Sequence, residues 1–285
     1  MYDKATIWLT KNYFAVRPIP WSIGYRGYRK HFISQALANP ELMSKFRQFQ
    51  PLPPDYGFAL DERCVEYPWL FAQLDTQPEC ILDAGSILNN KFLLEQPIWQ
   101  QKKLHILTLA PEKQCHWNRC ISYLFEDLRH IPIQDNYYDT VACISTLEHI
   151  GLDNRQFTSA DSYEENAPTD FLLAVREMRR VLKPSGHLLL TVPFGKYQNI
   201  GTQQVFNENL LEQTIAAFEP GEVTRTFFSY TKDGWQFADV SECKECEYVD
   251  WIMLPTEQRS AQFPMQPDGA TAARAVACVK LQKPK

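Results

Sequence analysis

The sequence lacks several features that would each indicate a class of protein. No hydrophobic run approaches the roughly 20 residues that a membrane-spanning helix needs, so we expect no membrane span. Basic residues are not in excess, because 29 Lys and Arg stand against 34 Asp and Glu, for a net charge of -5. Clustered Lys and Arg supply most of the affinity for nucleic acids. We therefore do not expect a nucleic acid as partner.

We also expect no metal-binding cluster and no signal peptide. The eight cysteines are scattered, and several lie inside hydrophobic runs, as reduced cysteines commonly do. Cys243 and Cys246 form a close pair, but without a second pair or nearby histidines this is weak evidence for zinc. The first residues contain no continuous hydrophobic stretch followed by a cleavage site, so we expect no signal peptide. We expect no metal and a reducing, cytoplasmic environment.

From residue 80 onward, short hydrophobic runs alternate with longer mixed segments. This alternation is typical of βα units and of a mostly parallel sheet. Helices are predicted at Phe171–Leu182 and Phe206–Phe218, where hydrophobic residues recur at helical spacing. The predicted strands cover Cys80–Ala84, Leu104–Leu109, Tyr123–Leu128, Thr140–Ser145, His187–Pro193, Glu222–Thr231 and Ala275–Leu281. We predict a Rossmann-like, doubly wound α/β fold with a seven-stranded sheet.

The first 75 residues do not follow this pattern. They are rich in proline and aromatic residues, and helical spacing occurs only in pieces, at Lys30–Ala38 and Pro40–Phe49. Asn39 before Pro40 is a typical start of a helix. We interpret residues 1–75 as a helical or irregular N-terminal cap and residues 76–285 as the α/β domain, with an insertion at about 232–271.

The segment Ile81–Asn89, ILDAGSILN, predicts a ligand-binding turn. A strand ends there in Asp83, and the chain then turns at Gly85. Open α/β sheets bind ligands beyond the carboxyl ends of their strands. A glycine lets the backbone approach a ligand, and an acid accepts hydrogen bonds from its amino or hydroxyl groups. An ordinary strand-to-helix turn is the alternative.

Two further motifs follow in order. DLRHIPIQDNYYD at Asp127–Asp139 runs into TVACISTLEH, and EMRRVLKPSGHLLLTVP covers Glu177–Pro193. With these motifs the chain resembles class I S-adenosylmethionine-dependent methyltransferases, especially those with a strand that ends in Glu-His. The resemblance covers about residues 78 to 194. It implies the class I methyltransferase fold and S-adenosylmethionine as cofactor.

The resemblance also implies the cofactor contacts. Asp83 and Gly85 would lie along the methionine part, and Asp127 would accept a hydrogen bond from the adenine amino group. Asp127 could instead cap a turn. The end of the fourth strand would border the sulfonium centre. The implied cofactor-binding residues are Asp83, Ala84, Gly85, Ser86, Thr108, Leu109, Asp127, Leu128, Ser145, Thr146 and Leu147.

The chain departs from the family pattern at three positions. Ile87 and Asn89 stand where further glycines are usual, and Thr108 stands where an acid commonly holds both ribose hydroxyls. A threonine makes one hydrogen bond where a carboxylate makes a bidentate pair, so we expect lower cofactor affinity. Glu112 could reach back to this position, or a cap residue could substitute. A binding protein of methyltransferase fold without activity is therefore one alternative.

We predict Glu148 and His149 as the catalytic residues. Methyl transfer is an in-line displacement, so the site mostly supplies alignment and excludes water. A hydroxyl acceptor must also lose a proton, and histidine titrates in the right range for a general base. The alternative is that His149 caps the next turn or packs beneath the cofactor.

The sequence says less about the acceptor. Asp61–Trp69 combines carboxylates, an arginine and rings, which suits a carbohydrate-like ligand, although we favour a salt-bridged structural segment. Trp235, Glu242 and Tyr248 form a second candidate group. The basic tract Tyr25–Phe32 is interpreted as a solvated face.

Our leading hypothesis is methyl transfer to a small-molecule or carbohydrate acceptor, at oxygen. An RNA methyltransferase would require a basic surface near the site. A nicotinamide-dependent oxidoreductase would require Gly-x-Gly-x-x-Gly after the first strand, which is missing. The oligomeric state is left open.

Overall fold

The computed structural model describes residues 12–16, 18–158, 160–249 and 268–285. Its sheet has eight strands in the order β3-β2-β1-β4-β5-β10-β8-β9, and β6 and β7 form a separate hairpin. The chain divides into two compact units. One consists of residues 1–73 and 226–276, and the other of residues 74–225 and 277–285. The division into a cap at residues 1–75 and an α/β domain at residues 76–285 remains a prediction.

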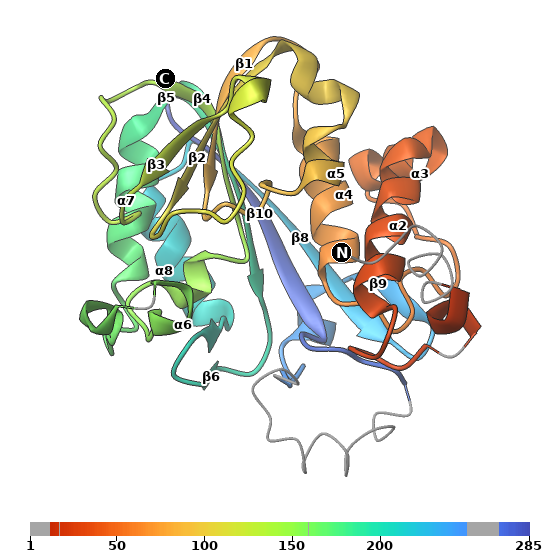
Figure 1. Ribbon diagram of the computed structural model, residues 1–285. Coiled ribbons are helices and arrows are strands. Elements are labelled where there is room, and N and C mark those ends of the chain that lie inside the picture. The colour runs from red at the N-terminus through yellow and green to blue at the C-terminus, as the bar shows by residue number, and fades with distance from the viewer. Residues whose placement is uncertain (1–11, 17, 159, 250–267) are drawn as a thin grey trace. The chain divides into compact units, whose positions relative to one another are not determined.

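The larger unit, residues 74–225 and 277–285, contains a parallel sheet (Figure 1). β1 pairs in parallel with β2 on one side and with β4 on the other, and β3 and β5 extend these two sides. Strand order therefore reverses between β1 and β4, which is where open α/β sheets bind their ligands. The strands are β1 (Glu79–Ala84), β2 (Lys102–Thr108), β3 (Ser122–Phe125), β4 (Tyr138–Ile144) and β5 (Leu182–Pro193).

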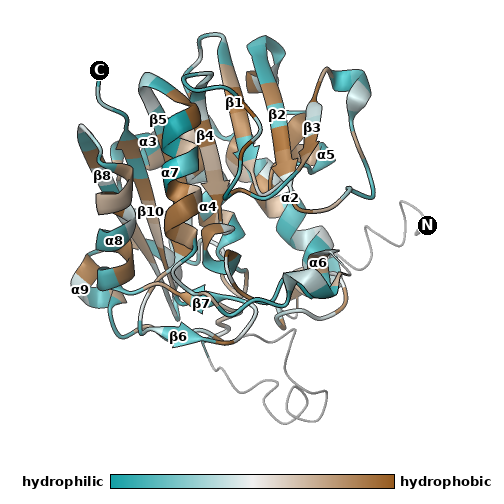
Figure 2. Ribbon diagram, turned by 90° about the vertical axis from the view of Figure 1, so that its left-hand side faces the viewer, coloured by the Kyte–Doolittle hydropathy of each residue, from teal (hydrophilic) through white to brown (hydrophobic). Residues whose placement is uncertain are grey.

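Helices and short segments complete this unit. In α7, hydrophobic residues recur every three or four positions, and this side of the helix is buried. Figure 2 shows the corresponding hydrophobic stretches on α7 and on β1 and β4. The side chain of Asn207 caps α8 by accepting a hydrogen bond from Leu210 N at 3.0 Å. The elements are α5 (Lys91–Leu94), η1 (Pro97–Gln101), η2 (Trp117–Arg119), η3 (Leu147–His149), α6 (Arg155–Thr158), η4 (Asp161–Tyr163), α7 (Phe171–Val181), β6 (Gln198–Asn199), β7 (Gln204–Val205) and α8 (Glu208–Phe218).

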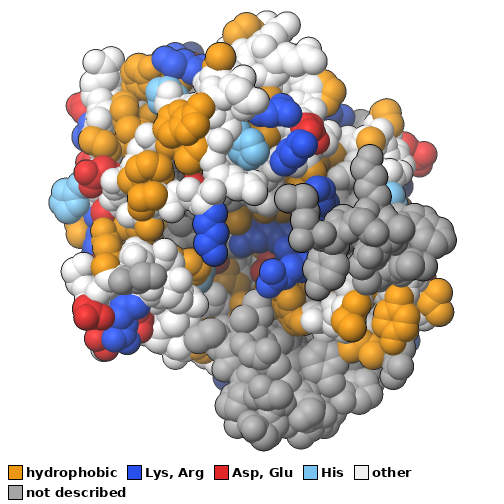
Figure 3. All heavy atoms as spheres, in the orientation of Figure 1, with side chains coloured by type: hydrophobic (Ala, Val, Ile, Leu, Met, Phe, Trp, Pro, Cys, Tyr) orange, Lys and Arg blue, Asp and Glu red, His pale blue; other side chains and the backbone are white. Residues whose placement is uncertain are grey.

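β3 lies at the edge of the sheet and is more exposed than its neighbours. Tyr123 contacts the ring of Trp117, with centroids 4.8 Å apart, and that of Phe125, at 6.5 Å. Trp117 and Phe125 are both exposed. Hydrophobic side chains are visible in the part of Figure 3 that corresponds to β3 in Figure 1.

The smaller unit, residues 1–73 and 226–276, contains the helices α2 (Tyr25–Ala38), α3 (Pro40–Gln48) and α4 (Arg63–Gln73). Asn39 caps α3 as predicted, because its side chain accepts hydrogen bonds from Glu41 N and Leu42 N. The remaining elements are β9 (Gly234–Ala238), α9 (Val240–Cys243) and the parts of β8 (Glu222–Thr231) and β10 (Ala275–Gln282) that fall in this unit.

The prediction of seven strands was one strand short. β9 pairs antiparallel with β8 from Thr231↔Gly234 to Phe227↔Ala238, within the segment that we interpreted as an insertion. Only Lys232 and Asp233 separate the paired ends, and Gly234 has φ +84°. Asp-Gly is a strong hairpin signal when it lies between alternating hydrophobic residues. The rest of that insertion includes residues 250–267, which lie outside the described residues.

The predicted α/β class and mostly parallel sheet are confirmed. Within the described parts of the chain, no helix has both the length and the hydrophobicity to cross a membrane.

Candidate functional site

The residues implied by the cofactor motif lie along one edge of the parallel sheet. Gly85 N donates a hydrogen bond to Leu107 O at 2.8 Å, which holds the turn after β1 against the end of β2. Glu126 N donates to Thr108 O at 3.0 Å and joins the ends of β2 and β3. Since parallel strands present their carboxyl ends on the same edge, the turns after β1, β2, β3 and β4 form one continuous row.

Asp83 organises the turn after β1. Its side chain is completely buried, and its carboxylate accepts hydrogen bonds from Ile87 N at 3.2 Å and Leu88 N at 2.8 Å. Burial raises the pKa of Asp83 to about 7, although these two backbone hydrogen bonds act to lower it. Asp83 therefore fixes the shape of the segment that contains Gly85 and Ser86.

At Gly85 the turn after β1 lies very close to the side chain of Thr146, which follows β4. The φ of Gly85 is +118°, and a Cβ atom there would overlap the side chain of Thr146. Only glycine fits both the conformation and the space. Gly85 and Thr146, two of the predicted cofactor-binding residues, are thus brought into direct proximity.

Glu112 lies beside the same turn, where the Ser86 hydroxyl donates a hydrogen bond to its carboxylate. Thr108 ends β2 and carries no charge, as the sequence indicated. Glu112 therefore places a carboxylate at the turn, although it is not among the predicted cofactor-binding residues. Asn89, which stands where a glycine is usual, accepts a hydrogen bond from Tyr123 Oη at 2.9 Å and donates one to Gln114 O at 3.0 Å.

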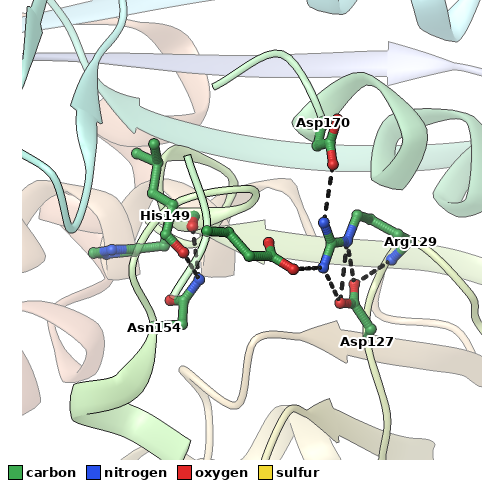
Figure 4. A network of polar contacts seen from close by, with 7 residues as sticks. Asp127, Arg129, His149, Asn154 and Asp170 are labelled. Carbon is green, nitrogen blue, oxygen red and sulfur yellow. Dashed lines mark hydrogen bonds and ion pairs between the residues drawn. The ribbon is translucent and has the colours of Figure 1, made fainter. Parts of the chain in front are cut away.

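The adenine end of the predicted site is built around Arg129 (Figure 4). Its Nε and Nη2 atoms donate to the Asp127 carboxylate at 3.1 and 2.7 Å, and its backbone N donates to Asp127 Oδ1 at 2.8 Å. Asp127 is thus also a turn residue, as the alternative stated. Nη2 donates to Glu165 at 2.7 Å, and Nη1 donates to Asp170 at 3.0 Å. The carboxylates of Asp127 and Glu165 raise the pKa of the Arg129 guanidinium. The neighbouring Leu128 is buried.

Arg129, Glu165 and Asp170 were not predicted as site residues. The spacing Asp-x-Arg at Asp127–Arg129 is the sequence signal that could have indicated the local turn. The ion pairs to Glu165 and Asp170 join residues 36 and 41 positions away, so local spacing contains no sign of them.

His149 ends the short helix η3, directly after the buried Glu148. Its Nδ1 atom lies 2.7 Å from Thr202 O. A backbone carbonyl only accepts hydrogen bonds, so Nδ1 carries the proton and Nε2 holds the lone pair of the neutral ring. Figure 4 shows the ring of His149 directed away from the Arg129 network. Next to Thr202, Gln203 is buried, and among the described residues its Nε2 atom has no hydrogen-bond partner.

The first acceptor candidate, Asp61–Trp69, forms the start of α4 within the smaller unit. The guanidinium of Arg29 pairs with Asp61, and Arg63 pairs with Glu66 at 2.8 Å. Burial, together with the charges of Asp61 and Glu66, raises the pKa of Glu62 to about 8. These ion pairs support the structural interpretation of the segment.

The second candidate group has structural roles in the same unit. Trp235 is completely buried, and its indole N–H donates to Leu60 O at 3.0 Å. Glu242 belongs to a capping box at the start of α9 and accepts a hydrogen bond from Asp239 N at 2.8 Å. Both side chains thus form hydrogen bonds within the chain.

Within the part of the chain that the structure describes, no three His, Cys, Asp or Glu side chains come together as metal ligands would. Each of the eight cysteines is outside any disulfide, and Cys120 is exposed.

Residues 105–190 match the model of a methyltransferase domain family. This match confirms, within residues 105–190, the resemblance to S-adenosylmethionine-dependent class I methyltransferases that the sequence motifs indicated. S-adenosylmethionine is the cofactor of that class, and the predicted cofactor is thereby confirmed.

Individual proteins are more distantly similar. An uncharacterized protein of Methanocaldococcus jannaschii is 28% identical over 82 residues, which cover 29% of this chain and 27% of that protein. A SAM-dependent methyltransferase from Archaeoglobus fulgidus is 11% identical with a TM-score of 0.49, covering 79% of this chain and 96% of that one. The Burkholderia thailandensis 1,6-didemethyltoxoflavin-N1-methyltransferase, with bound 1,6-didemethyltoxoflavin and S-adenosylhomocysteine, is 11% identical with a TM-score of 0.44, covering 88% of this chain and 89% of that one.

The residue types at the sheet edge are chemically suited to this cofactor. Gly85 keeps the turn after β1 free of a side chain, and Asp127 and Glu112 supply carboxylates on either side of the end of β2. Carboxylates suit the amino and hydroxyl groups of an adenosyl ligand, because such groups donate hydrogen bonds.

Proposed function

We propose that the chain transfers a methyl group from S-adenosylmethionine to a hydroxyl oxygen of a small-molecule or carbohydrate acceptor, with His149 as general base. The observation that carries this proposal is the hydrogen bond between His149 Nδ1 and Thr202 O at 2.7 Å. It fixes the tautomer that leaves Nε2 as the proton acceptor, which is the arrangement a general base requires.

In this proposal the bound sulfonium supplies the activated methyl group, and the chain supplies position and proton transfer. Asp127 accepts the adenine amino hydrogen bond, and Glu112 takes the ribose role that Thr108 fills only in part. Gly85, Ser86 and the end of β4 at Ser145, Thr146 and Leu147 border the methionine part. His149 Nε2 takes the acceptor's hydroxyl proton as the new oxygen–carbon bond forms, and Thr202 O then stabilises the protonated ring.

Two observations support a neutral, oxygen-bearing acceptor over RNA. The segment 153–170 contains five acidic residues and one arginine, so its charge opposes a phosphate backbone. The buried Gln203 amide N–H, beside the residue that holds His149, would pair with an oxygen of the acceptor. The eight free cysteines support the cytoplasmic location that we propose.

The experiment starts with calorimetry of S-adenosylmethionine and S-adenosylhomocysteine. Binding of both would be followed by screening with a labelled methyl donor against nucleotide sugars and cell-wall glycans. A methylated hydroxyl in the product is the expected result. Methylation only at nitrogen, or only of RNA, would contradict the acceptor that we propose.

A second candidate is a binding protein of the same fold without activity. It is favoured by the three N–H groups of Arg129 that already donate to Asp127 and by Thr108 in place of an acid. Absence of cofactor binding at millimolar ligand would select this candidate over the enzyme.

A further inference from the structure

The guanidinium of Arg129 is shared among three carboxylates that come from two parts of the larger unit. Asp127 follows β3, whereas Glu165 and Asp170 lie between η4 and the start of α7. The Arg129 side chain is 15% exposed, and the Asp127 side chain is 20% exposed. Partly desolvated, bidentate pairs of this kind are stronger and more directional than surface ion pairs.

The same unit contains a second turn of the same design. Arg155 N and Nε donate to Asp153 Oδ1 at 3.1 and 3.0 Å, and Arg155 Nη2 donates to Asp153 Oδ2 at 2.8 Å. Arg155 also pairs with Glu164, but its side chain is 41% exposed. The Asp-x-Arg turn is therefore a local structure that the chain forms twice. The added feature at Arg129 is its burial and its anchoring by Glu165 and Asp170.

The cluster around Arg129 contains three carboxylates for one guanidinium, so it has an excess of negative charge. A carboxylate offers about four lone-pair sites, and the donors of Arg129 use most of those on Asp127. The free position that remains has a fixed direction, because Arg129 is itself held by Glu165 and Asp170. Such a carboxylate can discriminate a hydrogen-bond donor by direction as well as by charge.

We propose that Arg129 is a positioning residue that aims the Asp127 carboxylate at the adenine amino group of the cofactor. The inference rests on the proposed function, because it requires an adenosyl ligand beside Asp127. It adds that adenine selectivity depends on an ion-pair network anchored at Glu165 and Asp170, and not on Asp127 alone.

The test compares S-adenosylhomocysteine with the analogue in which hydrogen replaces the 6-amino group of the purine. Calorimetry of the wild-type chain should show the adenine compound binding about 10-fold tighter, as expected for one directed hydrogen bond to a charged group. In Arg129→Gln this ratio should fall to about 2-fold. Arg155→Gln, the matched variant of the exposed turn, should keep the wild-type ratio.

A merely structural role of Arg129 would lower both affinities together and leave their ratio unchanged, and that result would overturn the proposal. Arg129→Lys keeps the charge but loses the bidentate fork, and it should give an intermediate ratio. This variant, with Glu165→Gln, provides the test if Arg129→Gln does not fold. Wild-type protein that binds both compounds equally would also overturn the proposal. Wild-type protein that binds neither would overturn the proposed function itself.

Discussion

The Nδ1 atom of His149 donates its proton to the backbone carbonyl of Thr202, 2.7 Å away. The contact joins the end of β4 to the hairpin of β6 and β7, so the tautomer of the ring is set by a part of the chain about 50 residues later. Because the acceptor is a backbone atom, side-chain substitutions at residue 202 should leave this orientation in place.

We expect His149→Ala to lower turnover by about 100-fold, the usual contribution of a general base, with cofactor affinity unchanged. Labelled-methyl assays and calorimetry with S-adenosylhomocysteine measure the two effects separately. Thr202→Ala keeps the carbonyl and is the matched control, expected to retain turnover. Unchanged turnover in His149→Ala would remove this residue from the mechanism.

Asp83 should make stability depend on pH. Its pKa is raised to about 7 in the folded chain, above its ordinary value, so the folded state binds the proton more tightly than the unfolded state. This contribution is fully present below about pH 4 and is lost as pH rises toward 7, on the order of 4 kcal/mol in total. Urea unfolding across this window should show a smaller fall for Asp83→Asn than for the wild type. Equal slopes would show that Asp83 does not titrate in this range.

Gly85→Ala should be more destabilising than a comparable change elsewhere. The new methyl group would overlap Thr146 and would also require φ +118°. Gly201 has φ +88° but has open space around it. Gly201→Ala should therefore lower the free energy of unfolding only through the unfavourable backbone conformation, by about 1 kcal/mol. Thermal or urea unfolding should place Gly85→Ala about 1–3 kcal/mol below Gly201→Ala. Similar losses in both variants would mean that the contact with Thr146 relaxes easily.

Gln203→Met should stabilise the chain and reduce activity. The buried Nε2 atom of Gln203 has no hydrogen-bond partner in the described parts of the chain, which is unfavourable, and methionine has a similar shape, so we expect a gain of about 1 kcal/mol. The adjacent Gln204 donates to Pro168 O at 2.7 Å, whereas its Oε1 atom has no partner among the described residues, so Gln204→Met should gain less stability than Gln203→Met. Stability by urea unfolding and turnover by methyl transfer give the two readouts. A Gln203→Met variant with full turnover would exclude a contact with the acceptor.

The sequence predicted the parts of the fold that local patterning determines. The strands around Asp83 and Thr140 are buried hydrophobic runs, and Asn39 and Asn207 are helix caps, so side-chain chemistry and spacing suffice. β9 was missed because the long segment after β8 was judged by its length, although Lys232 and Asp233 form a two-residue hairpin turn just before Gly234.

The candidate site was predicted less completely, for a physical reason. Motif residues such as Gly85 and Asp127 sit at strand ends, whose positions the alternation of elements already fixes. The environment of each residue comes from distant segments: Glu112 reaches Ser86, Asp170 reaches Arg129, and Thr202 reaches His149. Spacing along the chain does not contain such contacts, so they became visible only in the folded structure.

Cys120 follows η2 and is exposed, whereas the other seven cysteines are buried or partly buried. A maleimide dye added at low stoichiometry should therefore react first at this position, without any engineered residue. The dye would sit in the loop before β3, the strand that leads to Asp127. The natural chain thus already contains an attachment point for a fluorescent reporter of ligand binding, which would allow large compound collections to be screened without radioactive donor.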